Sequence, residues 1–201
     1  MEYCKVVEIT GRVEIQEAGG DVWRPLSAPR FLRGGDKIRT FGKSRVEFSA
    51  SADYSGLMRL APDSSLEVMG EDLTRFFLSR GIFSVLREED GGAPGLRRRE
   101  DSVFQVFTPD MAANLLQGGI SVSVYENGTC LRVFSERAKA GLFNGRKEKI
   151  FSLVVAEGFK LFTRASSKPG AACPTRMRFA DYGQWQSWMQ DCYQRKDGLE
   201  R

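Results

Sequence analysis

The sequence predicts an all-β protein with one α-helix near its C-terminal end. Apolar residues alternate with polar ones in short runs, such as 46–48 (VEF) and 66–68 (LEV), and a period of two is typical of strands with one buried face. Groups of Gly, Asp, Ser and Pro separate these runs, and such close alternation of strands and turns favours an all-β fold. Near the end of the chain the apolar spacing changes to that of a helix.

Short strands are expected along most of the chain. Asn127-Gly128 favours a tight hairpin turn between two of them. The sequence shows no strict repeat period, so it predicts a layered or solenoid-like stack of short antiparallel strands and hairpins. The expected strands lie at residues 6–9, 13–15, 37–40, 46–48, 58–60, 66–68, 73–78, 82–86, 103–108, 120–124, 130–134, 138–142, 150–155 and 159–162.

Three segments are expected: a β domain at residues 1–163, a linker at 164–180 and a helix at 181–198. The linker is rich in Ser, Lys, Pro, Gly and Ala. Asp181 is a suitable first capping residue for the helix, and Gly198 a suitable stop.

The helix is expected to be amphipathic, because Trp185, Trp188, Met189 and Cys192 follow the i, i+3, i+4, i+7 spacing of one helical face. The favoured interpretation is that this face packs on the β domain. The alternative is that Trp185 and Trp188 bind a partner protein.

Four cysteines, Cys4, Cys130, Cys173 and Cys192, allow three disulfide pairings. They include no Cys-x-x-Cys motif, which argues against a structural zinc site. In an oxidising compartment a bond between Cys173 and Cys192 is preferred because it would fix the C-terminal segment. Free buried thiols are an equally good interpretation.

The residue types argue against catalysis, cofactors and nucleic-acid binding. The chain contains no histidine, which excludes Ser-His-Asp and Cys-His nucleophiles and histidine metal sites, and it has no phosphate-binding glycine motif. The carboxylate pairs Glu88 with Asp90 and Asp53 with Asp63 fall in expected loops, where solvated turn residues are the simpler interpretation. We therefore expect no enzyme, no cofactor and no metal. The net charge of +4 is too small to indicate a nucleic-acid partner, and no apolar run is long enough to span a membrane.

Several short motifs follow one another along the chain. The central blocks are GDKIRT at 35–40, SRVEF at 44–48 and LAPDSSLEV at 60–68. Further blocks are ITGRVEIQ at 9–16, WRPL at 23–26, VFQVFTP at 103–109 and VVAEGFKL at 154–161. The order of these blocks resembles the FecR family of extracytoplasmic sensor domains.

This resemblance implies a periplasmic or otherwise extracytoplasmic bacterial protein whose export signal has been removed. It also implies a non-catalytic module of the cell envelope that binds a protein or receives a signal. The alternative is a module that binds envelope glycans or surfaces through the turn residues Tyr54 and Tyr125. The sequence names neither the partner nor the oligomeric state, and it assigns no sigma factor to the chain.

Overall fold

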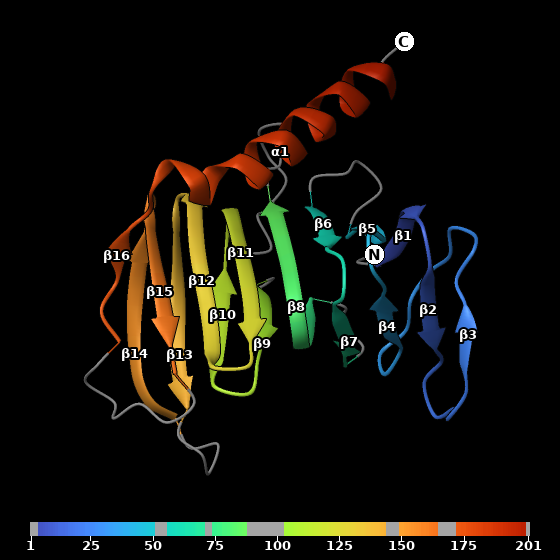
Figure 1. Cartoon of the computed structure of the whole chain (residues 1–201), viewed down its shortest axis with the longest axis horizontal. Coiled ribbons are helices and arrows are strands. Elements are labelled where there is room, and N and C mark those ends of the chain that lie inside the picture. Colours follow the sequence, from blue (N-terminus) through green and yellow to red (C-terminus); the bar gives the residue numbers. More distant parts are fainter. Residues whose placement is uncertain are drawn as a thin grey trace, which may run out of the picture.

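The computed structural model describes residues 4–50, 56–70, 74–87, 103–143, 149–164 and 172–199. Within these ranges the chain forms sixteen strands and one C-terminal helix, so the predicted all-β class is confirmed. The strands build two sheets that share one core (Figure 1). The two sheets give the layered arrangement that the sequence predicted as one form of this architecture.

Sheet A is antiparallel throughout. In spatial order it consists of β1 (Lys5–Thr10), β5 (Arg45–Ser49), β6 (Gly56–Leu60), the second half of β8 (Arg75–Arg87), β11 (Gly118–Tyr125), β12 (Gly128–Ser135), β15 (Phe159–Thr163) and β16 (Thr175–Arg176).

Sheet B is antiparallel except for the parallel pair β8 and β9. Its spatial order is β3 (Trp23–Pro25), β2 (Val13–Gln16), β4 (Lys37–Thr40), β7 (Ser65–Met69), the first half of β8, β9 (Phe104–Phe107), β10 (Met111–Leu115), β13 (Arg137–Phe143) and β14 (Lys149–Ala156).

Strand β8 belongs to both sheets. Phe76 and Leu78 are buried in its first half, and Phe83 and Val85 in its second half, so the buried positions change from even to odd numbers. A shift of one residue reverses the faces of a strand. Gly81, with a φ of 89°, lies between the halves and allows this shift, because positive φ is a conformation that glycine adopts without strain.

A buried polar cluster joins the two sheets. Asp110 lies between β9 and β10 of sheet B, whereas Thr129 and Thr163 belong to β12 and β15 of sheet A. The Asp110 carboxylate accepts hydrogen bonds from Thr129, from Thr163 at 2.6 Å and from Thr108 at 3.1 Å. The carboxylate is therefore satisfied by hydroxyl donors from both layers, as a buried polar group requires.

Helix α1 (Phe179–Leu199) packs on the outer face of sheet A (Figure 1). Its Trp185 ring stacks on Phe134 at 4.3 Å, and Trp188 lies edge-on to Trp185 at 5.0 Å. Leu57 and Leu86 of sheet A complete this cluster. Burying two indoles contributes on the order of several kcal/mol at ~25 cal/mol per Å², so the helix is held mainly by these rings.

The predicted helix start is two residues too late. The helix begins at Phe179, and Asp181 lies in its first turn rather than at the capping position. Its carboxylate accepts a hydrogen bond at 2.9 Å from the backbone N–H of Arg178, which is one half of a capping box. It also pairs with Lys160 at 2.7 Å and with Arg132 at 3.2 Å.

We expect Gly119→Ala to detach the helix partly, because a Cβ at Gly119 would collide with the Trp185 ring, which is already held by stacking on Phe134. The free energy of unfolding should fall by about 1–3 kcal/mol, and the tryptophan emission should shift to longer wavelength. The matched control is Gly183→Ala on the helix itself, where a Cβ meets no atom within 4 Å. This control should raise stability by up to about 1 kcal/mol; equal losses in both variants would contradict the packing.

We also expect the helix contact to weaken in acid. Burial alone would raise the pKa of Asp181, but hydrogen bonds from Lys160, the Arg178 backbone and Arg132 outweigh it and lower the pKa to about 2. A lowered pKa stabilises the fold at pH values above the unfolded-state pKa of about 4, and this contribution of about 2 kcal/mol is lost as the pH falls to about 2.

Denaturant unfolding followed by tryptophan fluorescence between pH 2 and pH 7 measures this change. Asp181→Asn should lower stability at pH 7 and reduce the acid dependence. Asp191→Asn is the control, because Asp191 is 44% exposed and lies 3.4 Å from Arg59, so its loss should cost less than about 1 kcal/mol. Unchanged acid dependence in Asp181→Asn would refute the assignment.

Candidate functional site

The structure separates the residues that the sequence suggested for partner binding. Tyr54 lies outside the described residues, and Tyr125 is 44% exposed at the hairpin between β11 and β12. Trp185 and Trp188 are 9% and 2% exposed. The indoles contact the chain's own sheet, so in this conformation they are not available to a partner.

The suggested carboxylate pairs fall largely outside the part of the chain that the structure describes. Asp53, Glu88 and Asp90 lie outside the described residues. Asp63 is a turn residue with a φ of 52° whose carboxylate accepts a hydrogen bond from the Gly42 N–H at 2.8 Å. In the part of the chain that the structure describes, no three cysteine or acidic side chains gather as metal ligands would.

Three of the cysteines are free thiols in this structure. Cys4 and Cys130 are buried, and Cys173 is exposed. Because Cys173 is a free thiol, the expected Cys173–Cys192 bond is not formed in this structure. Burial, together with the nearby Asp36 carboxylate, raises the pKa of Cys4 to about 12. Burial also raises the pKa of Cys130. These two thiols therefore act as small apolar core residues rather than nucleophiles.

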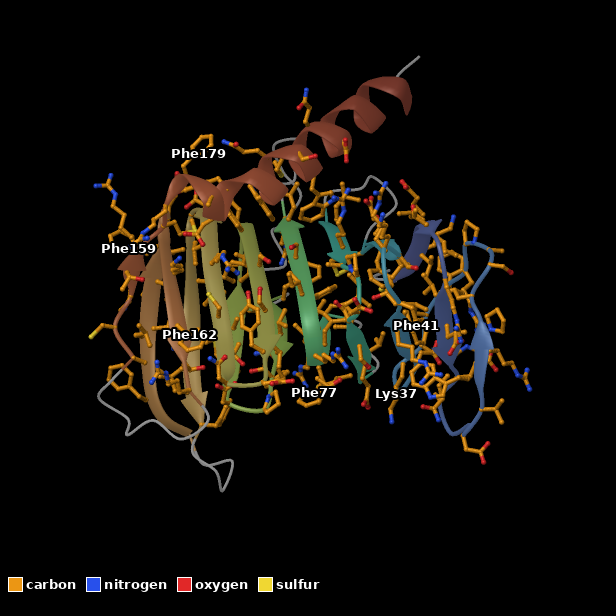
Figure 2. The ribbon with its side chains drawn as sticks, viewed as in Figure 1. Lys37, Phe41, Phe77, Phe159, Phe162 and Phe179 are labelled. Atoms are coloured by element: carbon orange, nitrogen blue, oxygen red, sulfur yellow. The ribbon has the colours of Figure 1, made fainter. Side chains whose placement is uncertain are left out.

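Exposed apolar side chains gather at the end of the molecule opposite β3. Of the nine exposed large apolar side chains in the described ranges, five lie on β14, β15 or the first residue of α1. Figure 2 shows three of them, Phe159, Phe162 and Phe179, at this end. Exposed apolar clusters often mark interaction sites. We call this region the β14 end and define it by Phe151, Val154, Phe159, Phe162 and Phe179.

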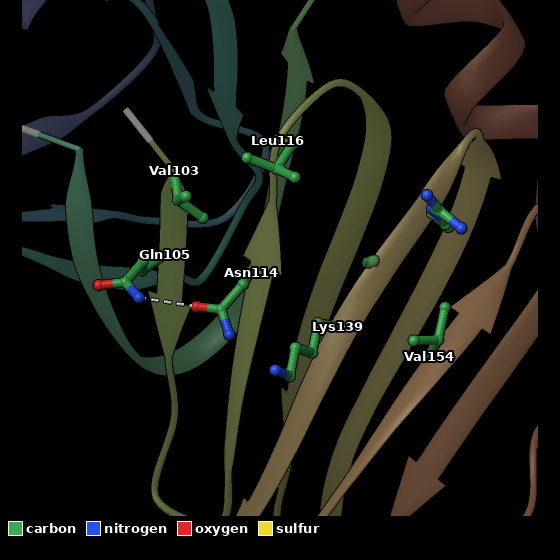
Figure 3. A pocket seen from close by; sticks show the side chains of 8 residues that line it. Val103, Gln105, Asn114, Leu116, Lys139 and Val154 are labelled. Atoms are coloured by element: carbon green, nitrogen blue, oxygen red, sulfur yellow. Dashed lines mark hydrogen bonds between the residues drawn. The ribbon is translucent and has the colours of Figure 1, made fainter. Parts of the chain in front are cut away.

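A groove of about 310 Å³ lies on sheet B beside the β14 end. Figure 3 shows side chains from β9, β10, β13 and β14 converging on it. The amides of Gln105 and Asn114 are joined by a hydrogen bond of 2.8 Å. We call it the sheet B groove; it is lined by Val103, Gln105, Asn114, Leu116, Arg137, Ala138, Lys139 and Val154.

The register of sheet B brings the groove residues together. Asn114 pairs with Gln105 of β9 and with Lys139 of β13, and Lys139 pairs with Val154 of β14. These four side chains therefore form a row across neighbouring strands. Leu116 and Val154 are 62% and 59% exposed, so the groove combines an apolar surface with amide groups that can donate and accept hydrogen bonds.

The cations of the groove differ from those elsewhere on the same sheet. Arg137 and Lys139 are exposed and form no ion pair with another described residue. At the opposite end of the sheet, Arg12 and Arg39 both bond the Glu14 carboxylate at 2.6 Å, and these bonds lower the Glu14 pKa. The groove therefore offers positive charge that an anionic ligand could pair with, whereas the Glu14 cluster is already satisfied.

No local sequence pattern predicts this groove. Its residues come from four strands between positions 103 and 154, and only the pairing of these strands brings them together. Trp23 of β3 is half-buried and covered by the Arg39 guanidinium at 4.1 Å. A local pattern cannot distinguish such positions, because both faces of a strand alternate with the same period.

The chain is therefore an all-β module with a groove on sheet B, near the edge of that sheet formed by β14. No protein-family model matches the chain, and a comparison with curated proteins found no match. No helix in the described part of the chain is both long and apolar enough to cross a bilayer.

Two crystal structures of provisionally assigned anti-sigma factors from Parabacteroides distasonis ATCC 8503 have a similar fold. One is 11% identical with a TM-score of 0.51, and the match covers 70% of this chain and 59% of that one. The other is 10% identical with a TM-score of 0.53, covering 75% of this chain and 64% of that one. The chain thus spans less than two thirds of those proteins, and the likeness at this identity establishes a shared fold.

We expect the groove cations to contribute little to stability. Arg137→Gln should change the free energy of unfolding by less than about 0.5 kcal/mol, because the side chain is exposed and forms no ion pair with another described residue. Arg59→Gln is the comparison: Arg59 pairs at 2.6 Å with Glu47, whose side chain is only 1% exposed. Losing this charge-assisted contact to a buried carboxylate should cost about 1.5–3 kcal/mol. Thermal and denaturant unfolding measure both; a large loss in Arg137→Gln would mean that the groove cations serve the fold.

Proposed function

We propose that this chain is a non-catalytic module that binds a protein partner through the β14 end and the sheet B groove. The observation that carries the proposal is that exposed apolar side chains concentrate at this end of the molecule, where Val154 lies beside two cations that form no ion pair with another described residue. Apolar contacts supply most of the affinity of protein interfaces, and charged residues at the rim supply specificity. The absence of histidine from the sequence supports a role without catalysis.

The setting we propose is extracytoplasmic and regulatory. The resemblance of residues 35–40, 44–48 and 60–68 to the FecR family supports a signal-receiving domain of the bacterial cell envelope. The similar fold of the two proteins provisionally assigned as anti-sigma factors agrees with a regulatory role. In this proposal the chain receives its signal as a protein contact, and sigma-factor binding is not part of the assignment.

A second proposed function is glycan binding. Tyr125 favours it, because this ring is 44% exposed at a hairpin turn, and exposed aromatic rings on loops are suitable for stacking on sugars. The protein-binding proposal is preferred, since it uses five apolar side chains and a groove rather than one ring.

A capture experiment with the purified chain tests the proposal. The immobilised protein should retain a polypeptide from an envelope extract, and Val154→Asp should reduce retention about tenfold or more, because it places a charge in the apolar contact. The matched control is Val22→Asp, since Val22 is also 59% exposed but lies next to β3, at the opposite end of sheet B.

Equal loss in Val154→Asp and Val22→Asp would contradict binding at the β14 end. Retention of purified peptidoglycan that disappears in Tyr125→Ala, with an unchanged melting temperature, would favour the glycan-binding function instead.

A further inference from the structure

We infer that β14 receives an extended, acidic segment of a partner protein as an added antiparallel strand of sheet B. This inference rests on the proposed function and specifies the mode of binding and the chemistry of the partner. In strand addition, backbone hydrogen bonds provide affinity, and alternating side chains provide specificity.

The four sheet edges are not equally open. On sheet B, β3 has only three residues and ends at Pro25, which has no N–H to donate. On sheet A, β16 has only two residues. The other edge strand of sheet A, β1, is covered by a neighbouring segment, because the Val6 N–H bonds the Arg30 carbonyl and the Leu32 N–H bonds the Cys4 carbonyl, both at 2.8 Å.

Among the described residues, strand β14 has none of these protections. It is eight residues long, contains no proline and pairs only with β13 among the described strands. Phe151 and Val154 on this strand are 47% and 59% exposed. Proteins usually shield long apolar edge strands against pairing with other chains. An edge strand without such shielding therefore indicates a site where a strand of another protein binds.

The register shows which backbone groups of β14 are free. The Phe143 N–H bonds the Asp110 carbonyl of the β10 side, so alternate residues of β13, namely Ala138, Ala140 and Leu142, direct their backbone groups toward β14. Their partners on β14 are Val155, Leu153 and Phe151. The intervening residues Ser152, Val154 and Ala156 therefore direct their N–H and C=O groups outward, where an added strand would lie.

The side chains around this edge specify an amphipathic, acidic segment. On the outer face, Lys139 lies beside Val154, and Arg137 lies beside Ala156, whose small side chain leaves the guanidinium a path to the edge. On the inner face, Phe151 is exposed and Leu153 is half-buried. An added strand would thus place carboxylates toward the two unpaired cations and apolar side chains against Phe151 and Leu153.

A synthetic probe tests this inference directly. The probe is a capped peptide of about eight residues in which valine alternates with glutamate, so that one face is apolar and the other acidic. It should bind the whole chain, and the amides of Ser152 and Val154 should exchange hydrogen more slowly when it is bound. A peptide that alternates valine with lysine should bind at least about tenfold more weakly, because like charges would meet at the outer face.

Two further controls test the backbone contact itself. Ser152→Pro removes an outward N–H at an edge position that tolerates proline and should weaken peptide binding about tenfold, whereas Ser152→Ala keeps that N–H and should bind normally. If Ser152→Pro does not fold, the valine–glutamate peptide methylated at alternate backbone nitrogens tests the same bonds from the ligand side, and normal binding of that peptide would overturn the inference.

Other outcomes are equally decisive. The free chain could instead form a dimer that is lost in Ser152→Pro. This result would mean that a second copy of the chain occupies β14, and it would overturn the inference that an acidic partner segment binds there. Capture that is lost in Val154→Asp but unchanged in Ser152→Pro would leave the proposed function standing and overturn strand addition. Peptide binding as expected, without capture of any envelope polypeptide, would support the edge chemistry and contradict the proposed function.

Discussion

The fold depends on one strand that serves two sheets. Strand β8 must present buried side chains to the same core along its whole length, although its two halves pair with different neighbours. Gly81 makes this possible by shifting the alternation by one residue. Ser64 reinforces the bend, because its hydroxyl accepts a hydrogen bond from the Ile82 N–H at 2.9 Å, and a Cβ at Gly81 would overlap it. The bend therefore brings both sheets around one core.

Much of this fold could be predicted from short-range patterns, because alternation and turn residues are local properties. The strands around 46–48, 58–60 and 66–68 were expected and are present as β5, β6 and β7. The continuity of β8 could not be predicted: its apolar pattern changes phase near Gly81, so the sequence suggests two separate strands. The spacing of Trp185 and Trp188 predicted one helical face, but it could not decide what that face contacts.

The candidate site was beyond prediction for a different physical reason. Gln105, Asn114, Lys139 and Val154 are ordinary outward-facing strand residues in the sequence, and their common surface arises from pairing between distant segments. The suggested aromatic residues were chosen for their chemistry, and chemistry alone does not reveal burial. Trp185 and Trp188 are buried between the helix and sheet A. Phenylalanines that the sequence analysis did not select are instead exposed on β14 and β15.

The placement of α1 determines which surface remains for a partner. The helix covers apolar residues on the outer face of sheet A and is fixed there by Trp185, Trp188 and the ion pairs of Asp181. Within the described residues, the outer face of sheet B carries no helix, and its β2–β4 region is occupied by the ion pairs of Glu14. Among the described residues, exposed apolar side chains and cations without an ion-pair partner therefore lie together beside β14. This strand is also the longest described edge strand whose outer backbone groups have no strand partner. A partner that pairs with this edge would extend sheet B without displacing the helix or opening the core.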